Sequence, residues 1–156
     1  KQSFSYTSKM KSITLPASIT QLGSRTFYSC TSLRQSALPD AITQLPEECF
    51  SGCNELTTVT MPASLTSIGD NAFYSCKALY SIELPATVTT IGNRAFSNCT
   101  ALESVTCCAT TPPSIGSQSF TFNNSQQCVI RVPAASVDAY KQAPNWRNLA
   151  DRIVAM

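Results

Sequence analysis

The sequence predicts an α/β repeat solenoid, in which short coils of chain stack on one another and share a single core. Three observations predict it: an internal period of 23 residues, apolar columns that keep this period, and a strand-like stretch before a proline in each unit. Periods of 20–50 residues are the mark of stacked repeat folds. The most regular columns are phenylalanine at Phe27, Phe50, Phe73 and Phe96 and cysteine at Cys30, Cys53, Cys76 and Cys99.

Each unit contains one strand-like stretch. Val59 and Met61 alternate with polar neighbours, which is the two-residue period of a half-buried strand. Pro62 follows, and proline cannot donate to a strand ladder, so the strand should end there. Because one unit cannot bury its apolar columns alone, the units must stack. We therefore expect a right-handed solenoid with a short parallel sheet on its concave side.

The second part of each unit is compact. In residues 68–76, the apolar positions have the spacing of a short helix or 3₁₀ turn, with Ala72, Phe73 and Cys76 on its inner side. Gly69 is expected to permit the bend into this turn. The convex side of the solenoid should therefore carry short helices or 3₁₀ turns.

The period also predicts how the chain is divided. Residues 1–12 match the second half of a repeat, so we expect that the chain belongs to a longer array or begins at a degenerate edge. One residue is inserted near 111–113, because Phe120 follows Phe96 by 24. The prediction is one solenoid domain over 1–156, with a partial repeat at 1–12, repeats at 13–35, 36–58, 59–81, 82–104 and 105–128, and a last strand with a C-terminal cap at 129–156.

The C-terminal segment is predicted to be a helical cap. Trp146, Leu149, Ala150 and Ile153 fall at i, i+3, i+4 and i+7, which is one face of a helix. Asn145 stands where an N-cap would be. A second short helix is expected over 136–141, and the two together should cover the open core edge that every terminal repeat leaves.

The consensus Ile-x-Leu-Pro-x-Ser-[Ile/Val]-Thr-x-Ile-Gly-x-x-Ala-Phe-x-x-Cys-x-x-Leu resembles the BspA-type leucine-rich repeat, most clearly over 61–104. The segment from Val132 to Ile153 resembles the closing segment of such proteins from Bacteroides-like gut bacteria. This resemblance implies a secreted or surface-exposed protein. Some proteins of this family adhere to host matrix proteins or to other bacteria, so the resemblance also implies adhesion as a possible role.

Composition argues against several classes of function. Charged residues are only 13% of the chain and the net charge is +2, so no basic patch for nucleic acid is expected. No stretch approaches the ~20 apolar residues of a membrane span. There is no histidine, the commonest general base. The adjacent pair Glu47–Glu48 is interpreted as the acidic first turn of a convex helix after Pro46. We predict no catalytic residue, no metal site and no cofactor.

Eight cysteines could indicate a metal site, disulfides or buried thiols. No Cys-x-x-Cys and no histidine are present to complete a zinc site. Side chains in register on stacked coils point in parallel, which holds their Cβ atoms slightly too far apart for a disulfide. The periodic cysteines are therefore interpreted as small core residues. A Cys108–Cys128 disulfide between the last two units stays open as the less favoured alternative.

The concave strand face is the predicted binding surface, because the curvature of a solenoid creates an extended surface there. Most of its outward side chains are serine and threonine, which are also ordinary residues for a solvated strand. The candidate ligand-binding residues are Arg34, Thr58, Thr60, Tyr80, Ser81, Glu83 and Glu103.

The sequence thus favours a non-catalytic binding or adhesion module of a secreted or cell-surface bacterial protein, anchored through a segment outside this chain. The expected partner is a host or bacterial surface protein or a glycan, and the module is expected to be a monomer. Two alternatives stay open: a structural spacer, and a targeting arm for another domain of a longer protein.

Overall fold

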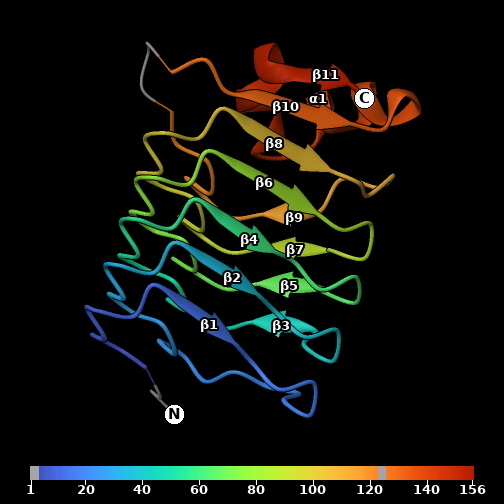
Figure 1. Cartoon of the computed structure of the whole chain (residues 1–156). Coiled ribbons are helices and arrows are strands. Elements are labelled where there is room, and N and C mark those ends of the chain that lie inside the picture. The colour runs from blue at the N-terminus through green and yellow to red at the C-terminus, as the bar shows by residue number, and fades with distance from the viewer. Residues whose placement is uncertain (1–3, 123–125) are drawn as a thin grey trace.

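A computed structural model describes residues 4–122 and 126–156. Coils of chain stack along one axis, and the parallel strands of successive coils lie side by side (Figure 1). One long-strand series runs along one side of the stack: β1 (Ser12–Thr14), β2 (Gln35–Ala37), β4 (Thr58–Thr60), β6 (Ser81–Leu84), β8 (Ser104–Cys107), β10 (Val129–Val132) and β11 (Ile153–Ala155). The predicted solenoid with parallel strands is confirmed.

The long strands pair in the register that the 23-residue period predicts, except that the partners on β8 and β10, such as Ser104 and Val129, are 25 residues apart. Val59 lies opposite Ser36, and Val105 lies opposite Ile82, each pair 23 residues apart. The series forms two sheets, because β1, β2 and β4 pair with one another and β6, β8, β10 and β11 do the same. Among the described residues, no strand pairing joins β4 to β6.

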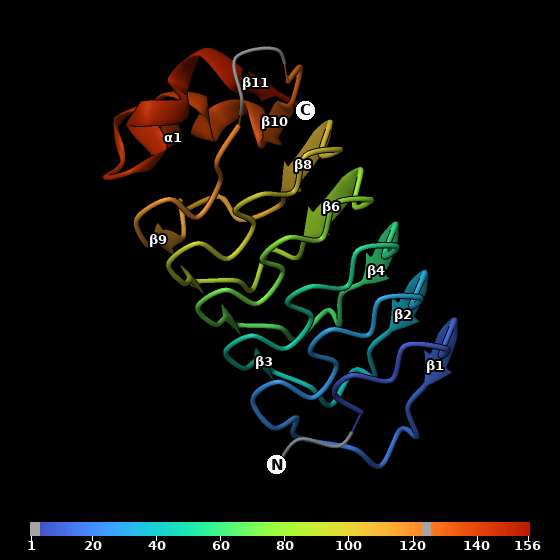
Figure 2. The ribbon, with the colours of Figure 1, turned by 90° about the vertical axis from the view of Figure 1, so that its left-hand side faces the viewer.

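A third sheet, absent from the sequence prediction, lies on another side of the coils. It consists of four two-residue strands: β3 (Gln44–Leu45), β5 (Ser67–Ile68), β7 (Thr90–Ile91) and β9 (Ser114–Ile115). Figure 2 shows these short strands apart from the long ones, with the core between them. The pairing of Ile91 with Ile115 places the inserted residue before β9, as predicted.

The turn segments of the coils are not short helices, one of the two forms that the sequence predicts, but they contain the i→i−3 hydrogen bonds of 3₁₀-type turns, as when the Tyr28 N–H donates to the Arg25 carbonyl at 3.1 Å. In the four turns that begin at Arg25, Glu48, Asn71 and Arg94, two positions four residues apart have left-handed backbone with φ between 53° and 76°. This conformation interrupts a right-handed helix. It also directs alternate N–H groups to the next coil, so that the Phe27 N–H donates to the Cys49 carbonyl at 2.9 Å and the Ser29 N–H to the Ser51 carbonyl at 2.8 Å. The left-handed columns are Arg25, Glu48, Asn71, Arg94, Gln118 and Tyr6, Ser29, Gly52, Ser75, Asn98.

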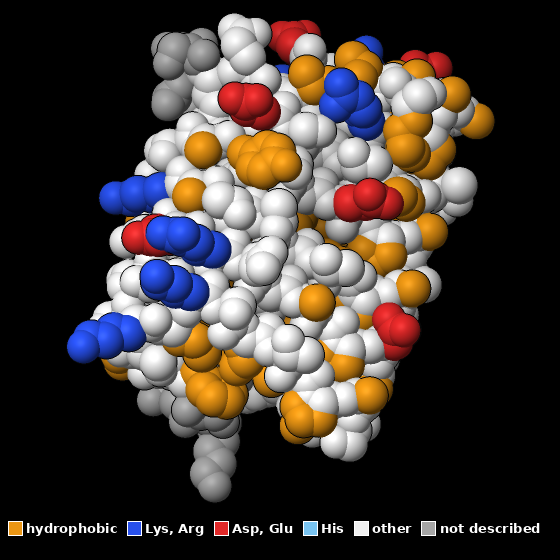
Figure 3. Space-filling model, viewed as in Figure 1, with side chains coloured by type: hydrophobic (Ala, Val, Ile, Leu, Met, Phe, Trp, Pro, Cys, Tyr) orange, Lys and Arg blue, Asp and Glu red, His pale blue; other side chains and the backbone are white. Residues whose placement is uncertain are grey.

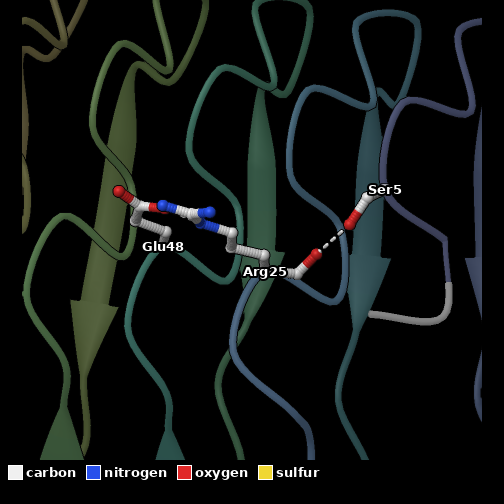
Figure 4. A network of polar contacts seen from close by, with 3 residues as sticks. All are labelled: Ser5, Arg25 and Glu48. Carbon is white, nitrogen blue, oxygen red and sulfur yellow. Dashed lines mark hydrogen bonds and ion pairs between the residues drawn. The ribbon is translucent and has the colours of Figure 1, made fainter. Parts of the chain in front are cut away.

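Side chains of the first left-handed column meet from coil to coil along the turns. Arg25 forms an ion pair with Glu48, and the Ser5 hydroxyl donates to the Arg25 carbonyl (Figure 4). Three repeat units further along, the Arg94 Nε donates to the Gln118 Oε1 at 3.0 Å. The interpretation of Glu47–Glu48 as a helix first turn is therefore wrong, because Glu48 is left-handed and its carboxylate binds the neighbouring coil. An exposed ion pair of this kind contributes little stability.

The phenylalanine column forms the centre of the core. Consecutive rings from Phe4 to Phe120 stack with centroids 4.9–5.7 Å apart and planes within 17° of one another. The stack continues through Phe120 onto Trp146, which meets Tyr140 edge to face. Offset or tilted aromatic pairs at such distances stabilise a core beyond their area alone.

The glycine column has a different role from the one expected of it. Gly69 has no left-handed backbone, but a Cβ there would lie 2.6 Å from the Glu47 nitrogen and 2.8 Å from the Pro46 carbonyl carbon. Gly92 and Gly116 face the preceding coil in the same way. These glycines permit close approach of two backbones and not a bend.

The C-terminal cap consists of η1 (Ala134–Ser136), α1 (Val137–Gln142), η2 (Trp146–Arg152) and β11. Trp146 and Tyr140 are fully buried against the last coil, as expected for a cap. The second predicted helix, over 136–141, corresponds to α1. The prediction that Ile153 continues the helical face of Trp146 is wrong, because Ile153 begins β11 and pairs with Ile130.

Asn145 is not an N-cap with a side-chain bond to its own helix. Its Nδ2 instead donates to the Ile115 carbonyl at 2.8 Å. In earlier coils that carbonyl position accepts the N–H of the next glycine, as when Gly116 donates to Ile91 at 2.8 Å. Similarly, the Trp146 Nε1 donates to the Pro113 carbonyl at 2.7 Å, where the Thr89 carbonyl accepts the Ser114 N–H one coil earlier. The cap thus replaces the backbone donors of a further coil with side-chain donors.

Candidate functional site: the long-strand face

The outward side chains of the long strands form columns, as the sequence predicts. Ser12, Gln35 and Thr58 are in register on the first sheet, and Ser81, Ser104 and Val129 are in register on the second. We call the surface made by the outward side chains of these strands the long-strand face. Figure 3 shows it largely uncharged, with lysine and arginine side chains gathered along the edge where the strands begin.

The predicted site residues divide into two groups in the structure. Thr58, Thr60, Ser81 and Glu83 line one cleft on the long-strand face. The other three residues, Arg34, Tyr80 and Glu103, precede the strands and lie along the flanking edge of the face. The structure therefore brings together four of the seven candidates.

The flanking residues do not form a cluster of their own. Arg34 is held by Glu55, whose Oε2 accepts from the Arg34 Nε at 3.1 Å. Tyr80 is half exposed, with 51% of its surface open to solvent. Glu103 is exposed in the coil that follows Tyr80, and its backbone N–H donates to the Tyr80 carbonyl at 2.8 Å. Tyr80 is thus the large aromatic ring that this edge offers to a ligand.

The cleft lies where the long-strand series is interrupted. It has a volume of about 410 Å³ and spans β4 and β6, the two strands that do not pair. On either side of the interruption the flanking backbone is bonded, because the Thr57 N–H donates to the Arg34 carbonyl at 2.9 Å and the Glu103 N–H donates to the Tyr80 carbonyl at 2.8 Å. Within the described residues, no such bond joins the Tyr80 N–H to the Thr57 carbonyl. Both residues are exposed, so the interruption lies at the surface of the stack.

The walls of the cleft combine apolar and polar side chains. Val59, Met61, Ala63 and Pro85 supply apolar surface, while the polar lining residues are Thr58, Thr60, Ser81 and Glu83. A concave, mainly apolar surface with a few polar groups is typical of a ligand site. Glu83 is the one charged residue among those that line it.

Glu83 forms no ion pair with another described residue. The two ion pairs among the described residues, Arg25–Glu48 and Arg34–Glu55, do not include it. Its Oε1 lies 3.8 Å from the Sγ of Cys108. Burial of the Cys108 thiol, together with the charge and hydrogen bond of Glu83, raises the pKa of Cys108, so this thiol is neutral beside the carboxylate.

Arg131 belongs to the long-strand face but is missing from the predicted site. It is in register with Thr106 on β8, which in turn is in register with Glu83 on β6. Its Nη1 donates to the Ser104 hydroxyl at 3.0 Å. The likeness of Ile130-Arg131-Val132 to Ile82-Glu83-Leu84 in the sequence was a sufficient signal to include it.

The eight cysteines are free thiols in the structure, and all except Cys108 are buried. In the periodic column, each thiol lies within hydrogen-bond distance of the carbonyl of the preceding coil's phenylalanine: Cys53 Sγ is 3.1 Å from the Phe27 oxygen, and Cys76 Sγ is 3.2 Å from the Phe50 oxygen. Burial raises the pKa of the Cys99 thiol to about 12, so it keeps the proton that it donates. The column therefore links coils by hydrogen bonds in addition to filling space, and Cys108 and Cys128 are not joined.

The described residues contain neither a metal-ligand cluster nor a helix that could span a membrane. No group of three histidine, cysteine, aspartate or glutamate side chains in the described ranges is arranged to hold a metal ion. The helices in the same ranges are all too short and too polar to cross a membrane.

Comparison with known proteins agrees with the repeat and with the stack. A family profile described as the BspA type leucine rich repeat region matches six copies over residues 1–131. The chain belongs to this family. A search of curated proteins found no match.

Solved structures of bacterial leucine-rich repeat proteins share this BspA-type fold. The Treponema pallidum protein TpLRR is 26% identical with a TM-score of 0.73, over 97% of this chain and 71% of that one. A Bacteroides ovatus leucine-rich repeat protein is also 26% identical, with a TM-score of 0.61 over 97% of this chain and 44% of that one. The pneumococcal vaccine antigen PcpA is similar in fold alone, at 17% identity and a TM-score of 0.66, over 94% of this chain and 40% of that one. The chain spans less than half of the last two.

Proposed function

We propose that this chain is a non-catalytic binding or adhesion module of a secreted or cell-surface bacterial protein. It engages a protein or a glycan of a host or bacterial surface through the long-strand face. The observation that carries the proposal is the cleft between β4 and β6, which interrupts an otherwise regular face and has both apolar walls and a carboxylate. A face that served only to be solvated would have no need of such a concave, half-apolar surface.

The absence of catalysis is part of the proposal. The chain has no histidine, and its exposed thiol at Cys108 has a raised pKa, which is the opposite of an activated nucleophile. The seven other thiols are buried and unable to reach a substrate. The family and the chemistry of the described side chains both support a role in recognition.

The alternative is a structural spacer or a targeting arm for another domain. It is favoured by the columns of Ser and Thr on the long-strand face, since these residues are ordinary on solvated strands. A spacer would have no ligand at the cleft, so the two functions differ in a measurable way.

The test is an array of glycans and extracellular-matrix proteins probed with the wild-type chain and two double variants. Tyr80→Ala with Glu83→Ala removes the aromatic ring and the carboxylate of the long-strand face. Tyr74→Ala with Glu47→Ala makes the same chemical change on the turns, where both residues are exposed.

We expect the wild type and the turn variant to bind the same array members and the face variant to lose at least about tenfold in signal, the scale of one good contact. Equal binding by all three proteins would remove the long-strand face as the binding surface. No binding by any of them, at concentrations up to the millimolar range, would favour the spacer.

A further inference from the structure

We infer that the cleft between β4 and β6 binds a lysine or arginine side chain of an extended polypeptide. This inference rests on the proposed function and deepens it, because it selects a protein partner over a glycan and names the group that is recognised.

The walls fit a side chain that is apolar along its length and charged at its end. Val59, Met61, Ala63 and Pro85 provide the apolar surface, and Glu83 provides one negative charge. Lysine and arginine bury their methylene stems against apolar surface and keep the cationic head beside polar groups. A neutral sugar would match the hydroxyls of the cleft but would leave the Glu83 charge without a partner of opposite sign.

The charge of Glu83 is available to a partner. Its one hydrogen-bond neighbour among the described residues is the weakly donating, neutral thiol of Cys108, 3.8 Å away. The basic residue nearest in its column, Arg131, lies two strands away, and its Nη1 already donates to the Ser104 hydroxyl at 3.0 Å. An incoming cation therefore meets a carboxylate that it does not have to detach from an internal ion pair.

The interrupted ladder provides contacts for the main chain of the partner. Tyr80 and Thr57 are exposed residues, and in the described part of the chain no bond joins the Tyr80 N–H to the Thr57 carbonyl, whereas the equivalent groups one coil before and one coil after are paired. An extended peptide recognises open strand groups through its own main chain, and its side chains then enter the pockets between. A donor and an acceptor next to a pocket for a basic side chain therefore form one recognition site for a polypeptide.

The experiment titrates the ¹⁵N-labelled chain with short peptides of the form acetyl-Gly-Ser-X-Ser-Gly-amide and follows the amide signals of Thr58, Thr60, Ser81 and Glu83. X is lysine, arginine, norleucine or Nε-acetyl-lysine. Norleucine keeps the apolar stem without the charge, and acetyl-lysine keeps the length without the charge. N-acetylchitobiose serves as the neutral saccharide probe.

We expect lysine and arginine peptides to shift these signals with a Kd at least about threefold below that of norleucine and acetyl-lysine, the scale of a partly exposed ion pair. Glu83→Gln should abolish this preference, and Glu47→Gln, the same change on the turns, should leave it unchanged. The preference should also weaken in high salt. Near-wild-type spectra of both variants would show that they are folded.

Three outcomes would overturn the inference: equal affinity for lysine and norleucine peptides, an unchanged lysine preference in Glu83→Gln, or saccharide binding at these four residues without peptide binding. Array members that bind the wild type while the basic peptides fail would leave the proposed function standing and reject only this inference.

Discussion

At the C-terminal end of the stack the last coil is covered by the cap, whereas at the N-terminal end the first coil has partly exposed apolar side chains. Leu15, Ile19 and Leu22 are only partly buried, although their counterparts one repeat later, Leu38, Ile42 and Leu45, are at most 6% exposed. The residue types are almost the same at the two places. The difference shows that a column position is buried by its neighbouring coils, so that stability in this fold is a sum of contacts between adjacent coils.

Trp146→Ala should give the largest change, because it opens the covered end. The indole is fully buried, stacks near Phe120 and Tyr140, and donates to the Pro113 carbonyl at 2.7 Å. Truncation of a buried aromatic costs about 3–5 kcal/mol of unfolding free energy. Urea unfolding followed by circular dichroism measures it. Tyr6→Ala, at the open end and 71% exposed, is the control and should change stability by no more than about 0.5 kcal/mol. An unaltered midpoint in Trp146→Ala would contradict the role of the cap.

A matched pair of leucines tests the comparison directly. Leu45→Ala should cost about 2–5 kcal/mol, because Leu45 is 1% exposed and lies in register with Ile68 of the next coil. Leu22→Ala changes the same residue type in the same column, but next to the open end, and should cost less than half as much. The same unfolding measurement applies. Equal losses would mean that the first coil is as well packed as the second.

Asn145→Ala should have a smaller effect at the covered end. The Asn145 side chain satisfies the Ile115 carbonyl at 2.8 Å, and its loss leaves that acceptor to water or unpaired. We expect a loss of about 1 kcal/mol, the scale of one hydrogen bond, because this bond is only partly buried. Asn148→Ala, at an exposed position of the same cap, is the matched control and should be nearly neutral. A similar loss in both variants would show that Asn145 does not act through its bond.

Ser36→Val should increase the free energy of unfolding slightly. Because Ser36 lies on β2, near the N-terminal end of the stack, this change should reduce the difference in stability between the two ends. Ser36 lies in the first sheet, is 5% exposed, and its hydroxyl has no hydrogen-bond partner among the described residues. Its column neighbour on the next strand is Val59. Valine replaces the unsatisfied buried hydroxyl with a methyl group and adds a second methyl group, and this should stabilise by about 1 kcal/mol. Ser12→Val, at an exposed position on the neighbouring strand, should not reproduce the gain.

The sequence predicted most of the fold because a periodic pattern repeats its evidence in every unit. The strands, their register, the core columns, the inserted residue and the aromatic cap followed from spacing alone. The left-handed positions of the turns were not predicted, because apolar spacing in residues 68–76 fits a helix, and of the two left-handed residues there only Asn71 is of a type enriched in that conformation. The strands β3, β5, β7 and β9 have only two residues each, which is too short for an alternation of apolar and polar residues to appear in the sequence.

The candidate site was predicted less completely. The 23-residue period placed Thr58, Thr60, Ser81 and Glu83 on one face, and all four line the cleft. The interruption between β4 and β6 was not predictable, because Thr58–Thr60 and Ser81–Leu84 carry the same alternation as strands that do pair. Whether two neighbouring strands bond depends on how their coils sit in three dimensions, which a linear pattern does not record.

The side-chain donors of the cap have a consequence for how such an array changes in length. Asn145 and Trp146 bond to carbonyls that earlier coils also present, at 2.8 Å and 2.7 Å respectively. The same terminator would therefore fit behind another coil of the same design. Duplication or deletion of one whole unit would leave this joint unchanged and alter only the number of strands on offer. A gene for this protein can thus lengthen or shorten the long-strand face in steps of one repeat without redesigning the end that closes it.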